Sequence, residues 1–240
     1  MSLTISATAL AQLAQTGACL RCFWVKLKSK RLPYQQFPGI FSSIDRYVKQ
    51  VTRRHFDHAG KLPDWFPPVG QVITLPPVPH FTRFRVTEPG TDVTLRGEPD
   101  VVVQLPGPTY HILDYKTARL SEAATGFFPV YQAQLNAYAY IANRTFFSPV
   151  SGLGLLYLDP DTNVDADPSL LARTGQEFLL GFTPHLRPVP LEHDSFVEGL
   201  LAQARSLYER PTPPPSNPGC TDCQAIEELF RLAGTAGGPS

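Results

Sequence analysis

The sequence predicts a mixed α/β fold in a single domain, and three observations support this prediction. The chain has 240 residues, of which 42% are hydrophobic, and this is enough to bury a sizeable core. Segments in which apolar residues recur at helical spacing stand on both sides of a central region of short β segments. The chain also holds 25 prolines, which favour short elements and loops over a helical bundle.

Helices are predicted near both ends of the chain and between the groups of strands. Ser6 can cap a short helix that reaches Gln15, and Gly17 follows it. Apolar residues at helical spacing, among them Ile44 and Val48, then predict a longer helix. The predicted helices cover about residues 7–15, 41–58, 130–143, 194–208 and 224–232.

Short runs of β-branched and aromatic residues predict the strands. Turn residues, among them Pro89-Gly90 and Pro106-Gly107-Pro108, separate several of these runs. The predicted strands cover residues 72–75, 82–86, 93–96, 101–105, 110–115, 152–158 and 177–182. This order of elements is typical of an α/β or mixed α+β domain with one core.

The single domain is expected to cover residues 1–232, followed by a disordered tail at 233–240. No stretch approaches 18 uninterrupted apolar residues, so no membrane span is predicted. The first residues lack the positive charges of an export signal. We therefore expect a cytoplasmic protein without a membrane partner.

A predicted hairpin brings two carboxylates together. If its strands pair symmetrically about Gly107, Asp100 lies opposite Asp114, with Cβ atoms roughly 5 Å apart. Lys116 shares a face with Asp114 because side chains alternate along a strand. Two carboxylates at this distance repel, and a hard divalent cation such as Mg²⁺ or Mn²⁺ would compensate their charge. The alternative is that both carboxylates cap turns or face solvent, with Lys116 as an ordinary ion-pair partner.

Three motifs follow one another along the chain: Gly97-x-x-Asp100, Asp114-Tyr115-Lys116 and Gln134-Leu135-Asn136-Ala137-Tyr138. They resemble those of the PD-(D/E)xK nuclease superfamily, and most of all its branch with the RecB nuclease domain and the Cas4 exonucleases. The resemblance extends from about residue 5 to 230. It implies a restriction-endonuclease-like core over about residues 39–208, in which helices flank a central mixed sheet.

The resemblance implies a metal-dependent DNA nuclease and a role for each motif residue. Asp100 and Asp114 would ligate the catalytic Mg²⁺ or Mn²⁺, together with the backbone carbonyl of Tyr115. Lys116 would activate the attacking water or stabilise charge on the phosphate. The remaining pair, Gln134 and Tyr138, would orient Lys116 or contact the DNA backbone. These two residues lie one helical turn apart, so they could instead belong to an ordinary amphipathic helix with Tyr138 in the core.

One family ligand is missing. Members of this branch usually carry a histidine four residues after a glycine in the helix before the strands, and here Ser43 follows Gly39 at that place. Asp45 is the nearby side chain able to bind a metal, and we expect it to substitute. The missing histidine also supports an alternative function, a weakly active or inactive DNA-binding subunit of a larger nucleoprotein complex.

Four cysteines form two CxxC pairs, in segments 17–24 and 218–225 that bracket the core. The resemblance implies a [4Fe–4S] cluster, whereas paired CxxC segments are equally typical of structural Zn²⁺. Either group would join the two ends of the chain, and the remaining alternative is four unconnected buried thiols. The predicted ligands are Cys19, Cys22, Cys220 and Cys223.

The charge distribution bears on the partner. Net charge is zero, yet residues 19–54 hold nine basic side chains against Asp45 alone. Such a region could track phosphates, or it could be an ordinary solvated face. The resemblance implies an exonuclease on single-stranded DNA or DNA ends, in repair, recombination or defence, with a helicase or a CRISPR-type protein as candidate partners. A third hypothesis for the function is a structural protein that is stabilised by a zinc ion and does not act on nucleic acid.

Overall fold

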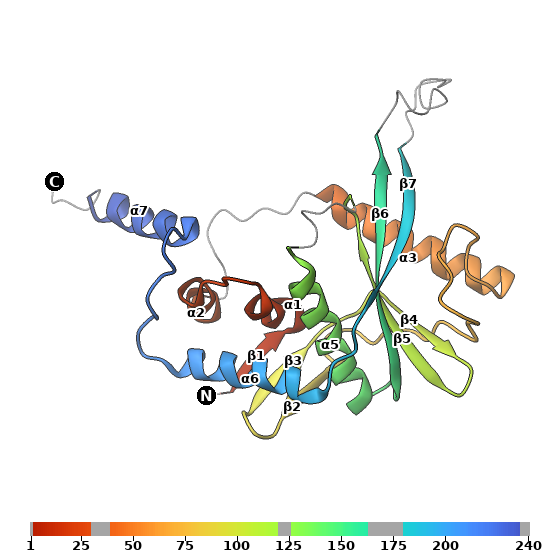
Figure 1. Cartoon of the computed structure of the whole chain (residues 1–240), viewed down its shortest axis with the longest axis horizontal. Helices are drawn as coiled ribbons and strands as arrows, with labels where there is room; N and C mark the ends of the chain where they lie inside the picture. Colours follow the sequence, from red (N-terminus) through yellow and green to blue (C-terminus); the bar gives the residue numbers. More distant parts are fainter. Residues whose placement is uncertain (1, 30–38, 120–125, 163–179, 236–240) are drawn as a thin grey trace.

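The computed structural model describes residues 2–29, 39–119, 126–162 and 180–235, and it confirms the mixed α/β class. Its strands form two sheets rather than one, and helices flank both (Figure 1). Helix α5, Phe128–Arg144, lies between the sheets and contacts strands of each. Among the described residues, no helix is long and apolar enough to cross a membrane.

The larger sheet has the strand order β4-β5-β6-β7. Its outer pairs are antiparallel, while β5 and β6 run parallel and α5 makes the crossover between them. The predicted hairpin register is confirmed, because Val101 pairs with Leu113 and Leu105 with Thr109. Gly107 has φ +80° in the turn, a conformation that glycine adopts without strain. The strands are β4 Val101–Leu105, β5 Thr109–Lys116, β6 Val150–Asp161 and β7 Gly181–Val189.

The smaller sheet has the order β1-β3-β2. Its strands are β1 Leu3–Ser6, β2 Arg85–Glu88 and β3 Val93–Arg96. Strand β1 is four residues long and pairs in parallel with β3, so its partner is remote in sequence and no local pattern predicted it. Instead of a strand at 72–75, the structure has an isolated bridge between Thr74 and Gln104.

Helix α1, Ala7–Ala11, begins at the predicted cap, since Ser6 Oγ accepts a hydrogen bond from the Ala9 N–H at 3.1 Å. A 3-10 turn, Gln12–Ala14, follows it. A helix that was not predicted, α2, spans Leu20–Ser29. The other predicted helices are confirmed, most with slightly different ends, as α3 Gly39–Ala59, α5, α6 Asp194–Glu209 and α7 Thr221–Thr235. Residues 177–179 of the last predicted strand and residues 236–240 of the predicted tail lie outside the described residues.

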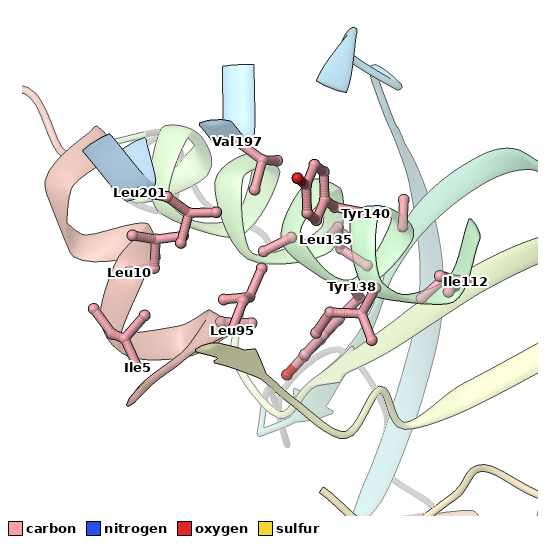
Figure 2. Close-up of a cluster of buried hydrophobic side chains, with 14 of the residues drawn as sticks. Ile5, Leu10, Leu95, Ile112, Leu135, Tyr138, Tyr140, Val197 and Leu201 are labelled. Atoms are coloured by element: carbon pink, nitrogen blue, oxygen red, sulfur yellow. The ribbon is translucent and has the colours of Figure 1, made fainter. Parts of the chain in front are cut away.

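Two apolar clusters cover opposite faces of the larger sheet, because successive strand residues point to opposite sides. On one face, Ile112 packs with α5, which is buried continuously from Ala133 to Ala142. Figure 2 shows this cluster, where side chains of α1, α5 and α6 meet, among them Leu10, Leu135 and Leu201. The other face packs against α3. The end of the hairpin is thereby held between α5 and α3.

Candidate active site and cysteine cluster

The confirmed register places Asp100, which directly precedes β4, opposite Asp114 of β5. Both side chains are largely buried, at 14% and 5% exposure. Asp100 Oδ2 accepts a hydrogen bond from the Tyr115 N–H at 2.7 Å, and this bond fixes the carboxylate against the strand. Burial and the neighbouring charge of Asp114 raise the pKa of Asp100 to about 7. The hairpin therefore concentrates negative charge where little water can screen it.

Lys116 lies within this group of charges. Its ammonium forms an ion pair with Asp114 Oδ2, donates a hydrogen bond to Gln134 Oε1 at 3.4 Å and stands 4.3 Å from the centre of the Tyr131 ring. These contacts come from β5 and α5, so they hold the amine from two sides. The structure thus brings Lys116 beside the carboxylate pair, at the position that the motif predicted.

Gln134 connects Lys116 to the core. Its Nε2 donates hydrogen bonds to Tyr138 Oη at 2.9 Å and to Thr8 Oγ1 at 3.2 Å. Tyr138 is buried among the apolar side chains of α5 (Figure 2), and burial raises its pKa to about 12, so its hydroxyl stays neutral. Gln134 therefore makes the expected contact with Lys116. Tyr138 is instead a core residue, and its hydroxyl supports Gln134.

Gly97 has a role that the sequence did not reveal. A Cβ atom at this position would lie 2.4 Å from Tyr138 Cε1, which is closer than real Cβ contacts allow. The glycine of the first motif therefore leaves room for the tyrosine of the third. This contact cannot be seen in the sequence, because it forms only when α5 packs across β3 and the hairpin.

Replacing Gly97 with alanine should destabilise the protein by about 1–3 kcal/mol, because the added methyl group overpacks the core against Tyr138. Chemical denaturation followed by circular dichroism measures this change. The matched control is Gly199→Ala in α6, where an added Cβ meets nothing within 4 Å and alanine favours the helix by up to about 1 kcal/mol. A Gly97→Ala protein as stable as the native one would contradict the packing argument.

Helix α3 adds two charged groups to the site. Lys49 Nζ lies 2.8 Å from Asp45 Oδ2 and 2.6 Å from Asp100 Oδ1. Burial opposes the charge of this lysine, yet Asp100 and Asp45 raise its pKa above the ordinary value, so it carries an ammonium. The structure thus brings Asp45 to the edge of the carboxylate group with Lys49 between. Lys49 was not among the predicted site residues, and the one signal for it is its i,i+4 spacing from Asp45.

The donor atoms fit a hard divalent cation. Asp114 Oδ2 is buried and accepts no hydrogen bond from the described residues, apart from its ion pair with Lys116. A carboxylate oxygen in that state gains most from a cation that prefers oxygen ligands. Asp100 faces it, and burial together with the charge of Asp114 raises the pKa of Asp100. These two carboxylates are the residues able to hold the metal ion that the fold family implies.

The four cysteines come together at one place in the fold. All four sulfur atoms lie within 4.8 Å of one another, with Cys22 Sγ 3.3 Å from Cys223 Sγ and 3.5 Å from Cys220 Sγ. They form no disulfide. Burial opposes ionisation, but hydrogen bonds from Asn217 and the neighbouring cysteines lower the pKa of Cys19 to about 6. A clustered set with a thiolate at neutral pH suits a metal site and excludes four unconnected thiols.

This cluster joins the two ends of the chain. Cys19 directly precedes α2 and Cys22 lies in its first turn, whereas Cys220 directly precedes α7 and Cys223 lies in its first turn. Around it, Asn217 Nδ2 donates to the Gly17 carbonyl at 2.8 Å. In Figure 1, α7 stands beyond α2, at the opposite end from the larger sheet. The predicted connection between the termini is therefore present.

The mixed α/β fold, with a hairpin that brings two carboxylates and a lysine together, defines the class of the nuclease-fold hydrolases. The family model described as the PD-(D/E)XK nuclease superfamily matches residues 8–227, and the chain belongs to this superfamily. A comparison with curated proteins gives no match.

Three solved structures match the chain at low sequence identity. The structure of the protein SSO0001 is 15% identical with a TM-score of 0.47, and the match covers 89% of this chain and 79% of that one. An alkaline exonuclease from Laribacter hongkongensis, LHK-Exo, is 14% identical with a TM-score of 0.41, covering 97% of this chain and 94% of that one. Its complex with dAMP matches over the same shares at 12% identity and a TM-score of 0.41.

Proposed function

We propose that this protein is a Mg²⁺- or Mn²⁺-dependent nuclease that hydrolyses phosphodiester bonds of DNA. The observation that carries the proposal is the buried pair of Asp100 and Asp114 with Lys116 beside it, in a chain of the PD-(D/E)XK superfamily. An ordinary surface cluster would not keep two facing carboxylates at 14% and 5% exposure.

In this proposal Asp100, Asp114 and the Tyr115 carbonyl hold the metal ion, and Asp45 is a further candidate ligand. When bound, the ion supplies a Lewis acid and lowers the pKa of a water ligand. Lys116, held by Asp114 and Gln134, donates a hydrogen bond to the attacking water or to the scissile phosphate. Its ammonium stabilises the negative charge that develops on the phosphate oxygens.

The proposed substrate is single-stranded DNA or a DNA end, degraded exonucleolytically in repair, recombination or defence. Support comes from α3, which borders the site and exposes Arg46, Tyr47 and Arg54. Basic and aromatic side chains of this kind bind phosphates and stack on bases. Lys30 and Arg31 of the basic region lie outside the described residues. A helicase or a CRISPR-type protein remains the proposed partner.

For the cysteine site we propose a bound metal group, either a [4Fe–4S] cluster or Zn²⁺. Four thiolates around one tetrahedral Zn²⁺ stand roughly 3.8 Å apart, given Zn–S bonds of about 2.3 Å. The separations of 3.3 to 3.6 Å between the paired sulfurs are near that value. A [4Fe–4S] cluster needs a wider spacing because each sulfur ligates a different iron atom. The sulfur spacing therefore favours Zn²⁺ over the iron–sulfur cluster that the resemblance implies.

Cleavage assays with Mn²⁺ test the nuclease proposal. We expect the purified protein to shorten linear single-stranded DNA from its ends, whereas circular single-stranded DNA of the same sequence should stay intact. Cleavage of the circle would contradict the exonucleolytic mode while retaining the nuclease. The label is placed at either end in separate reactions, so the products also report polarity.

A second candidate function is a DNA-binding subunit that cleaves poorly. It is favoured by Ser43 at the place of the family histidine, and by the lysine that stands between two of the acidic groups. Intact DNA in every cleavage reaction, together with a shifted band in gel retardation, would support this function and overturn the first.

A further inference from the structure

Lys49 is the most tightly held charge of the site that the proposed mechanism does not use. Its ammonium contacts carboxylates from two elements, Asp45 of α3 and Asp100 at the start of the hairpin, at 2.8 and 2.6 Å. An ammonium has three donors and no acceptor, so both contacts are charge-assisted hydrogen bonds. With 36% of its side chain exposed, Lys49 is confined but still reachable by water and ions.

Helix α3 is anchored where it carries this lysine. Tyr115 Oη donates a hydrogen bond at 3.2 Å to Thr52 Oγ1, which is buried. On the next residue, Arg53 donates hydrogen bonds to the Leu75 and Pro76 carbonyls. Because Tyr115 directly follows Asp114 on β5, the hydrogen bond couples α3 to the strand that carries the carboxylate. The backbone position of Lys49 is therefore set by the packing of α3 on the sheet.

The charges of the site form one ion pair and one group of three. Lys116 is paired with Asp114, while Lys49 is shared by Asp45 and Asp100. Among the described residues at the site, three carboxylates thus face two ammonium groups. The formal charge of this group of five side chains is therefore −1 when all are ionised. A single divalent ion would more than balance it, and two ions would leave the site strongly positive.

We propose that Lys49 is a resident cation that takes the place of a second metal ion, so that this nuclease site works with one divalent ion. Two-metal sites place their ions about 3.5–4 Å apart, bridged by shared carboxylates. Here a second ion bridging Asp45 and Asp100 would have to displace the Lys49 ammonium, because Mg²⁺ needs its oxygens at about 2.0–2.1 Å. Lys49 is on this account a positioning residue that aims Asp100 at the one ion.

The inference deepens the proposed function and rests on it. It also assigns Asp45 differently from the expectation of a metal ligand: in the native protein Asp45 holds Lys49, and it becomes a ligand only when the amine is removed. Removal of the Lys49 amine is therefore expected to add a metal-binding site. A variant that merely failed to fold would lose metal binding instead.

The test counts Mn²⁺ ions by electron paramagnetic resonance and titration calorimetry, on full-length protein with its cysteine site loaded. We expect about one Mn²⁺ per chain in the native protein and about two in Lys49→Gln. The double variant Asp45→Asn/Lys49→Gln should return to about one, since the second ion then loses a ligand. Lys61→Gln is the matched control, because the ion pair of Lys61 with Asp64 is exposed, and this variant should still bind about one ion.

Two results would overturn the inference. One is about two Mn²⁺ ions in the native protein, and the other is an unchanged count of about one in a folded Lys49→Gln variant. In either case DNA cleavage by the native protein would leave the nuclease proposal standing. A native protein that neither binds Mn²⁺ nor cleaves DNA would instead reject the proposed function itself, and this inference with it.

Discussion

Replacing Asp114 with asparagine should reduce DNA cleavage by about 10³-fold or more, because the variant loses one of the two carboxylates proposed to hold the metal ion. The side chain is buried on β5, and the asparagine keeps its shape, so the fold should survive. Without Asp114 beside it, Asp100 loses one of the charges that raise its pKa. We therefore expect a folded protein with weak Mn²⁺ binding.

Lys116→Ala separates the two roles in this centre. It should lose cleavage by a similar factor while still binding Mn²⁺, since the amine is proposed to act on water or phosphate rather than on the metal. Single-turnover cleavage of labelled DNA and Mn²⁺ titration measure the two effects. Asp64→Asn serves as the control, because Asp64 is 86% exposed and forms its ion pair with Lys61, away from the carboxylate pair. Undiminished cleavage in both Asp114→Asn and Lys116→Ala would refute the site assignment.

The largest effect on stability is expected from the cysteine cluster. Removing the bound metal by chelation, or replacing Cys223 with serine, should lower the unfolding temperature by about 10 °C. Within the described part of α7, Cys223 is the one buried side chain, so apolar packing holds this helix weakly. The proposed metal would tie it to α2, whose Phe23 belongs to the main core. Loss of the metal should therefore release α7 and loosen α2.

Differential scanning calorimetry and limited proteolysis can detect this change, with elemental analysis to identify zinc or iron. We expect proteases to cut the proline-rich segment before α7 much faster after chelation. Arg21→Ala is the control, since it removes only the exposed ion pair with Glu227, at 2.7 Å, which contributes at most about 1 kcal/mol. Equal unfolding temperatures with and without the metal would show that the cluster does not stabilise the fold.

The sequence by itself determined the hairpin and its charges. A short turn at Gly107 sets the register of β4 against β5, and strand alternation then places Asp100, Asp114 and Lys116 on one side. These relations are local, because the residues that decide them are neighbours along the chain. The same holds for most helices, whose apolar periodicity and caps are visible in any window of the sequence. Strand β1 is too short for a strong local signal. Helix α2 did carry one that the prediction missed, since Leu20, Phe23 and Leu27 recur at helical spacing.

Only the tertiary structure decided which distant residues complete the site. Packing of α3 against β5 places Lys49 between Asp45 and Asp100, and packing of α5 against the hairpin brings Tyr138 onto Gly97. The two CxxC pairs likewise meet only because α2 and α7 fold back to one place. Such contacts depend on how whole helices and strands pack against one another. That packing is determined by the volume and burial of side chains from all parts of the chain. The local sequence thus identifies Asp100, Asp114 and Lys116 as the centre of the site. The proposed number of metal ions depends on Lys49, which only the packed fold brings there.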